Sequence, residues 1–151
     1  MTTHDKFVRY LMESIDPQFA VAKWLHKKGV DITINGLDVS PEASQAKLHT
    51  DGGDIVTPKG VIDVKHLKNV EFTNAIDFPY PQATAGFKPS IDKLMPGLYA
   101  AFFVNAAIGH AYIVKSDTSH AWSVRDVYDA VTGNPKPSYF VGLEHCRFIE
   151  L

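Results

Sequence analysis

The sequence contains little cysteine and no long apolar run. Cys146 is the single cysteine among 151 residues, which excludes a framework of internal disulfides and suits a reducing compartment. No stretch is apolar for long enough to cross a bilayer, and the opening residues M-T-T-H-D-K lack the basic and apolar regions of a secretory signal. We therefore expect a cytoplasmic protein without a membrane-spanning segment.

The chain also lacks an excess of either charge. It has 15 lysines and arginines against 17 aspartates and glutamates, a formal net charge of −2, which excludes a uniformly basic surface for nucleic acid. Any contact with DNA must then come from a local patch. Basic residues gather near the end of one predicted helix and on a predicted hairpin: Lys23, His26, Lys27, Lys28, Lys59, Lys65, His66 and Lys68.

Motifs of several common enzyme classes are absent. The sequence has no GxxxxGK[ST] phosphate loop and no GxGxxG fingerprint, which argues against nucleotide-driven and dehydrogenase chemistry. It has no HExxH or CxxC spacing despite seven histidines, which argues against a zinc site. His145 precedes Cys146, but adjacent strand residues point to opposite faces, so we do not expect a thiol activated by a histidine.

Length and composition favour one globular domain. With 151 residues, of which 45% are hydrophobic, the chain can bury a sizeable core, and we expect a single domain over residues 1–151. The spacing of apolar residues predicts helices over 5–14, 16–28 and 89–95, and strands over 30–35, 98–105 and 110–116. These elements predict an α/β fold in which helices flank a mixed central sheet.

The remaining segments have weaker patterns. Residues 37–50 are polar and irregular, and the stretch 68–87 is predicted to lack regular structure because prolines and a glycine interrupt it. A serine cap and apolar residues at helical spacing predict a helix over 124–131 that ends at Gly133. Residues 134–137 are expected to be a rigid linker, and 138–151 alternates sufficiently to form one closing strand or a pair of strands.

The most informative stretch is a predicted hairpin within residues 51–67. Thr57-Pro58-Lys59-Gly60 has proline and glycine at the positions that a type I turn favours. If Pro58 and Lys59 form the tip, Asp54 comes to lie opposite Asp63. Lys65 follows two residues later and therefore shares a strand face with Asp63.

This arrangement predicts metal-dependent chemistry. Two carboxylates that face each other across a hairpin repel one another unless a cation lies between them. Oxygen ligands of this kind suit a hard cation such as Mg²⁺, and a nearby lysine can steer a water molecule or stabilise charge on a phosphate. Asp54, Asp63 and Lys65 are therefore the candidate catalytic residues.

Asp54 followed by Asp63-Val64-Lys65 resembles the signature of the PD-(D/E)xK nuclease superfamily, the fold of many restriction endonucleases and Holliday-junction resolvases. The resemblance implies a restriction-endonuclease-like fold and Mg²⁺-dependent hydrolysis of DNA, as an endonuclease or an exonuclease, with Mn²⁺ as a substitute. It also implies that Asp54 and Asp63 ligate the metal with the backbone carbonyl of Val64. Small members commonly act as dimers, so a homodimer is expected from the resemblance.

The helix before the hairpin extends this resemblance. In the superfamily an acidic residue commonly lies about three turns before the glycine that ends this helix, and Gln18 occupies that position here. Glu13 is the alternative source of a third negative charge. A polar residue after the lysine strand often completes such a site, which makes Gln82 and Lys88 candidates. Together with four lysines they form the predicted DNA-binding set: Lys27, Lys28, Lys59, Lys68, Gln82 and Lys88.

Two alternatives remain open from the residues alone. The chain is then either a catalytically inactive nuclease-fold protein that binds nucleic acid or a protein partner, which Gln18 in place of an acid supports, or a different domain whose hairpin acids are solvated. Four aromatic residues near the hairpin allow two interpretations, stacking on nucleic-acid bases or fixing a long loop to the core: Phe72, Phe78, Tyr80 and Phe87.

Overall fold

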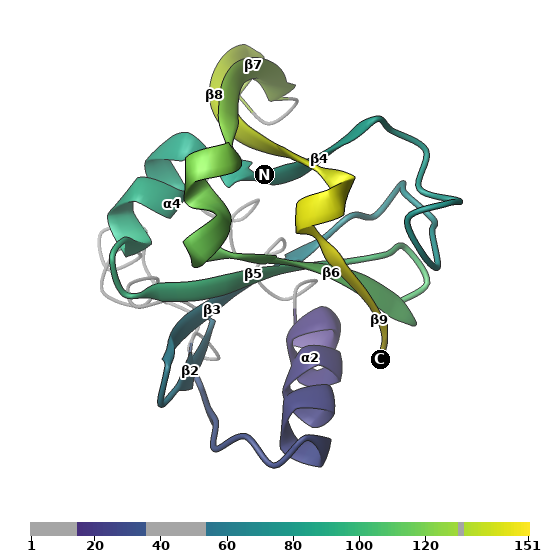
Figure 1. Cartoon of the computed structure of the whole chain (residues 1–151), viewed down its shortest axis with the longest axis vertical. Helices are drawn as coiled ribbons and strands as arrows, with labels where there is room; N and C mark the ends of the chain where they lie inside the picture. Colours follow the sequence, from purple (N-terminus) through teal and green to yellow (C-terminus); the bar gives the residue numbers. More distant parts are fainter. Residues whose placement is uncertain (1–14, 36–53, 130–131) are drawn as a thin grey trace, which may run out of the picture.

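The computed structural model describes residues 15–35, 54–129 and 132–151, which form an α/β structure with a mixed six-stranded sheet (Figure 1). The predicted helix over 5–14, Glu13 and the segment 37–50 lie outside these residues. The elements are α2 (Ile15–Lys27), β1 (Thr33–Ile34), β2 (Ile55–Thr57), β3 (Gly60–His66), β4 (Gln82–Phe87), α4 (Lys88–Leu94), β5 (Leu98–Val104), β6 (His110–Lys115), η2 (Ser116–Ala121), β7 (Ser123–Asp129), β8 (Asn134–Gly142), η3 (Leu143–His145) and β9 (Arg147–Glu150).

The large sheet has the strand order β1-β2-β3-β5-β6-β9, and a second, three-stranded sheet has the order β4-β8-β7. Strands β3 and β5 are parallel, and the other neighbours in the large sheet are antiparallel. The predicted α/β class with a mixed central sheet is therefore confirmed. In the described part of the chain, no helix is both long and apolar enough to cross a membrane.

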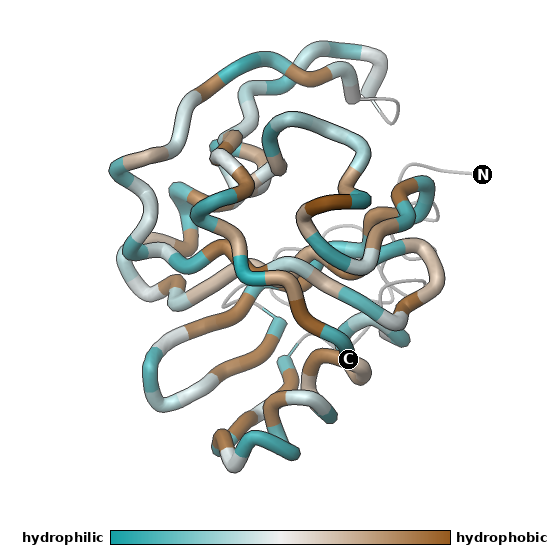
Figure 2. Tube along the Cα trace, turned by 45° about the vertical axis from the view of Figure 1, so that its right-hand side comes forward, coloured by the Kyte–Doolittle hydropathy of each residue, from teal (hydrophilic) through white to brown (hydrophobic). Residues whose placement is uncertain are grey.

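The large sheet is buried on both faces. Helix α2 covers one face, and the small sheet lies over the other (Figure 1). This explains the sequence of β5, which is apolar throughout because its alternate residues enter two different cores. Phe102 packs on the α2 side, whereas Ala101 and Phe103 pack on the side of the small sheet. In Figure 2 the apolar segments accordingly gather towards the middle of the molecule, and hydrophilic segments are common in the outer loops.

Several predicted elements are confirmed. The helix over 89–95 corresponds to α4, the strands over 98–105 and 110–116 correspond to β5 and β6, and the closing segment forms a pair of strands, β8 and β9. The helix over 16–28 corresponds to α2, which buries Val21, Ala22 and Leu25 and leaves Phe19 48% exposed. The strand predicted over 30–35 is reduced to β1, which has two residues.

The predicted helix over 124–131 is wrong, because residues 123–129 form strand β7. The apolar residues at helical spacing do not mark a buried helix face: Val124 and Tyr128 are exposed. β7 pairs instead with β8 along its whole length, from Ser123 with Phe140 to Asp129 with Asn134. Valine and tyrosine fit strands well, so the pairing with a distant segment prevails over a weak helical pattern.

Two other predictions fail for a related reason. Residues 134–137 are not a linker but the first part of β8, and residues 82–87 are not irregular but form β4. β4 pairs only with Ser138 to Gly142 of β8. The first part of β8, which contains Pro135 and Pro137, therefore does not pair with β4. Proline is tolerated on the side without this pairing because no backbone donor is needed there.

The predicted hairpin register is confirmed for the paired residues. Thr57 pairs with Gly60, Val56 with Val61, and Ile55 with Ile62. Gly60 has φ 132°, and a Cβ placed on it would lie 2.5 Å from the carbonyl oxygen of Gly97. The next residue, Val61, donates its backbone N–H to that same oxygen at 2.9 Å. Glycine at this position thus lets the hairpin approach the start of β5.

We predict that Gly60→Ala lowers the free energy of unfolding by about 2 kcal/mol or more, because the new methyl group meets backbone at a φ that favours glycine. Gly109→Ala is the matched control, since a Cβ there would meet no atom within 4 Å. Urea denaturation of both variants measures the difference. Equal stability of the two variants would contradict the close approach at Gly60.

Candidate active site

Strand β3 carries Asp63 and Lys65 on the face that looks towards the small sheet. Their partners in parallel β5 are Ala101 and Phe103, and both of these belong to the core on that side. The Lys65 Nζ atom lies 3.4 Å from Asp63 Oδ1. The prediction that Asp63 and Lys65 share a face is therefore confirmed, and the two side chains form an ion pair.

Asp54 lies one residue before β2, where the pairing with β3 ends. Its backbone N–H donates to the Ile62 carbonyl oxygen at 3.1 Å, and its Oδ2 atom accepts a hydrogen bond from the Val64 backbone N–H at 2.7 Å. The carboxylate thus satisfies a strand N–H that would otherwise need a backbone partner from the neighbouring strand. This bond holds the Asp54 side chain beside β3, close to Asp63.

Gln18 reaches the same place from helix α2. It is 2% exposed, and its Nε2 atom lies 3.4 Å from Asp54 Oδ1. Val21 and Ala22 follow Gln18 by three and four residues, so the three share one face of the helix, the face that packs against the sheet. Helix packing thus directs Gln18 towards Asp54, and the structure brings Gln18, Asp54, Asp63 and Lys65 together.

The surroundings of Asp54 make its carboxyl harder to ionise. Burial of Asp54, followed by the nearby charge of Asp63, raises the pKa of the Asp54 carboxyl from 3.8 to about 7; the Val64 N–H and the Lys65 charge oppose this rise. The charge of Asp63 also raises the pKa of Lys65. At neutral pH the pair therefore carries a proton for part of the time, unless a cation replaces it.

The oxygen atoms at this site fit a hard divalent cation. Asp63 Oδ2 is buried and has no hydrogen-bond donor among the described residues. Within a strand, the N–H and C=O groups of one residue point towards the same neighbour, so the Val64 carbonyl faces the side on which Asp54 lies. No cluster of three or more histidine, cysteine, aspartate or glutamate side chains occurs in the described ranges. A cation here would thus have two carboxylates and otherwise neutral oxygens or water.

The predicted DNA-binding lysines do not all lie near this site. Lys27 ends α2, roughly 14 Å along the helix from Gln18 at about 1.5 Å per residue. The Lys28 ammonium lies 5.5 Å from the centre of the Trp24 ring, and that of Lys59, in the hairpin turn, lies 5.7 Å from the centre of the Tyr99 ring. The structure therefore separates Lys27 and Lys28 from the carboxylates.

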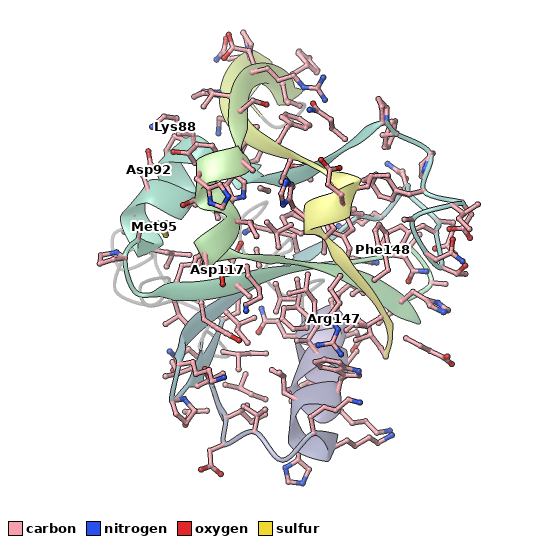
Figure 3. The ribbon with its side chains drawn as sticks, viewed as in Figure 1. Lys88, Asp92, Met95, Asp117, Arg147 and Phe148 are labelled. Atoms are coloured by element: carbon pink, nitrogen blue, oxygen red, sulfur yellow. The ribbon has the colours of Figure 1, made fainter. Side chains whose placement is uncertain are left out.

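The other three predicted contacts lie on different elements. Lys68 is an exposed residue after β3, and Gln82 is an exposed residue at the start of β4. Lys88 begins α4, where its ammonium pairs with Asp92 and lies 5.5 Å from the centre of the Tyr139 ring. Figure 3 shows Lys88 and Asp92 side by side on this helix. The Lys88 charge is thus partly compensated within the chain.

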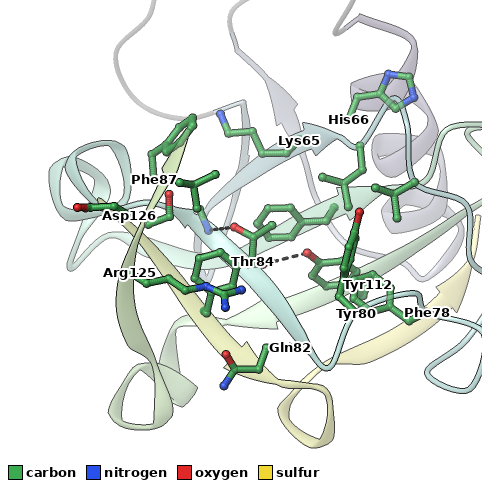
Figure 4. A pocket seen from close by; sticks show the side chains of 17 residues that line it. Lys65, His66, Phe78, Tyr80, Gln82, Thr84, Phe87, Tyr112, Arg125 and Asp126 are labelled. Atoms are coloured by element: carbon green, nitrogen blue, oxygen red, sulfur yellow. Dashed lines mark hydrogen bonds between the residues drawn. The ribbon is translucent and has the colours of Figure 1, made fainter. Parts of the chain in front are cut away.

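A cavity of about 650 Å³ adjoins the site, and Lys65 forms part of its wall (Figure 4). Its lining includes Arg125, which the sequence analysis did not single out. The guanidinium carbon of Arg125 lies 3.7 Å from the centre of the Phe140 ring. The residue was missed because 124–131 was predicted to be a helix, and only the pairing of β7 with β8 brings Arg125 over Phe140.

We predict that, without divalent ions, the protein loses stability as the pH rises towards 8. The folded state holds a proton on Asp54 up to about pH 7, whereas the unfolded value is 3.8. The folded state therefore binds more protons in this window, and its advantage disappears as the pH rises through the folded pKa. Asp54→Asn should flatten this dependence. Urea denaturation in EDTA between about pH 5 and 8 tests it, and equal slopes in both proteins would contradict the buried pair.

We compared the chain with known protein families, curated proteins and solved structures. No protein family, no curated protein and no solved structure matches the chain.

Proposed function

We propose that this protein is a metal-dependent deoxyribonuclease of the restriction-endonuclease-like class, which hydrolyses DNA phosphodiester bonds. One observation carries the proposal: two neighbouring carboxylates, the buried Asp63 and the half-buried Asp54, lie beside a lysine whose Nζ atom is 3.4 Å from Asp63, and the pKa of Asp54 is raised to about 7. The two aspartates and the lysine belong to a hairpin of a mixed sheet, and the helix before this hairpin contributes Gln18. The three side chains of the D…DxK pattern thus lie close together.

Each residue has a distinct part in the proposed reaction. Asp54 and Asp63 would hold a Mg²⁺ ion together with the Val64 carbonyl, and Gln18 orients Asp54 through its amide. When bound, the ion supplies positive charge that stabilises the phosphate in the transition state. Lys65 holds and polarises the attacking water, because its ammonium is placed by Asp63 and also faces the cavity.

A second function is favoured by one specific observation. Gln18 occupies the position at which an acid is expected from the resemblance, and its amide leaves the described site with two carboxylates rather than three. A site with less negative charge holds a divalent ion less tightly. The alternative is therefore a nuclease-fold protein that binds DNA or a protein partner without cutting.

Divalent ions test the carboxylate pair directly. Mg²⁺ or Mn²⁺ should raise the melting temperature, because an ion that binds only the folded state stabilises it. Asp63→Asn should abolish this rise. Asp117→Asn is the matched control, since Asp117 is exposed and forms an ion pair with Lys115 at 3.4 Å. Equal thermal shifts in wild type and Asp63→Asn would remove the metal from the proposal.

Substitution of Lys65 distinguishes the proposed enzymatic function from the alternative binding function. Lys65→Ala should reduce single-turnover cleavage by about a hundredfold or more, as expected for the loss of a positioned catalytic group. Binding to DNA in Ca²⁺ should change little. Lys115→Ala, at an exposed strand end with a comparable surface ion pair, is the control and should cleave normally.

The same assay identifies the alternative. If the wild-type protein binds DNA but cuts no single-stranded, duplex, flapped or branched form with Mg²⁺ or Mn²⁺, the binding function replaces hydrolysis. If Lys65→Ala weakens binding and lowers the salt dependence by about one unit without a separate loss of turnover, Lys65 contacts only a phosphate.

A further inference from the structure

The cavity beside Lys65 lies between the two sheets. Lys65 and Phe103 contribute to its wall from the large sheet, and residues of β4, β7 and β8 contribute from the small sheet. Because Lys65 also pairs with Asp63 at 3.4 Å, the cavity opens directly beside the proposed site of hydrolysis. Whatever occupies it would lie next to the group that holds the attacking water.

Two aromatic side chains are exposed in the lining of this cavity. Tyr80 and Phe87 both line it, and they are 54% and 37% exposed. Phe72 and Phe78 are instead buried in the core on that side of the sheet. Phe72 and Phe78 therefore hold the loop to the core, and Phe78 also forms part of the cavity wall. Tyr80 and Phe87 present exposed aromatic surface to a ligand.

The exposed aromatic at Tyr80 is held in place before any ligand binds. Its ring makes an edge contact with Phe78, with ring centres 5.9 Å apart, and Phe78 packs in turn on Tyr112 at 5.5 Å. Figure 4 shows Tyr80, Tyr112 and Phe78 together at one end of the cavity. A preorganised ring binds a planar group without an additional cost of ordering.

Charged side chains accompany the aromatic surface: two cations, Lys65 and Arg125, and one carboxylate, Asp126, line the cavity (Figure 4). Lys65 and Arg125 belong to β3 and β7, on different walls of the cavity (Figure 4). The Arg125 guanidinium lies over the Phe140 ring, with its central carbon 3.7 Å from the ring centre. Aromatic rings together with cations are the combination that binds unpaired nucleotides, since the rings stack on bases and the cations contact phosphates.

We propose that this cavity receives one unpaired base of a DNA strand, beside the phosphodiester that is hydrolysed, so that the substrate class is single-stranded DNA. This inference rests on the proposed nuclease function. A volume of about 650 Å³ lies within the range of small-molecule sites and is more than large enough for one base. In a duplex the faces of the bases are covered by their neighbours, and a base can enter such a cavity only after it has left the stack.

Binding in Ca²⁺ tests the cavity independently of cleavage. Fluorescence anisotropy should show about tenfold or tighter binding of a single-stranded oligonucleotide than of the same sequence in a blunt duplex. Tyr80→Ala and Phe87→Ala should each weaken single-strand binding about tenfold, within the range expected for one lost base stack. Tyr128→Ala is the matched control, because Tyr128 is 70% exposed and does not line the cavity. It should bind as wild type does.

An abasic series locates the base. One abasic position moved along the oligonucleotide should weaken wild-type binding at a single register, and Tyr80→Ala should abolish that register dependence. Equal single-strand binding by wild type, Tyr80→Ala and Phe87→Ala would overturn the inference.

Cleavage assays with Mg²⁺ distinguish failure of the cavity from failure of the proposed function. If the wild-type protein cuts blunt duplex as fast as single strand and Tyr80→Ala leaves that ratio unchanged, the nuclease proposal stands and the base cavity is wrong. If it cuts no DNA but binds single strands in a manner that depends on Tyr80 and Phe87, the cavity is supported and hydrolysis is wrong.

Discussion

The hydrogen bond from the Val64 backbone N–H to the Asp54 carboxylate is the contact on which the candidate site depends. It forms where the pairing of β2 with β3 ends. The Asp54 side chain there accepts the hydrogen bond that a backbone carbonyl of a neighbouring strand would otherwise accept. A hydrogen bond of this kind favours the charged carboxylate. It also keeps Asp54 beside Asp63, although the charges of the two groups oppose that arrangement.

The charges at this position do not balance without a proton or a cation. Lys65 neutralises part of the negative charge, and its Nζ atom lies 3.4 Å from Asp63. Asp54 receives hydrogen bonds from a backbone N–H and, over a longer distance, from the neutral Gln18 amide. A protein that only needed a stable hairpin would gain from replacing one of these acids. Such stored destabilisation is typical of functional sites, where a ligand supplies what the chain lacks.

The position of the site follows from the layers around the large sheet. α2 covers one face and delivers Gln18, whereas Asp63 and Lys65 point towards the other face and the cavity. Asp54 lies one residue before β2 and contacts both Gln18 of α2 and the Val64 backbone N–H of β3. The small sheet then has a separate part in the proposed function, because its strands bring Arg125 and Phe87 to the cavity wall.

The sequence by itself determined the local part of this arrangement. Turn chemistry at Thr57 to Gly60 set the hairpin register, and the period of two along β3 placed Lys65 with Asp63, because both rules act within a few residues. Only the tertiary structure decided that residues 123–129 form a strand, that Arg125 lies over Phe140, and that Tyr80 and Phe87 line a cavity beside Lys65. These depend on pairing between distant segments, whose burial and hydrogen bonds outweigh the local preferences that a sequence displays.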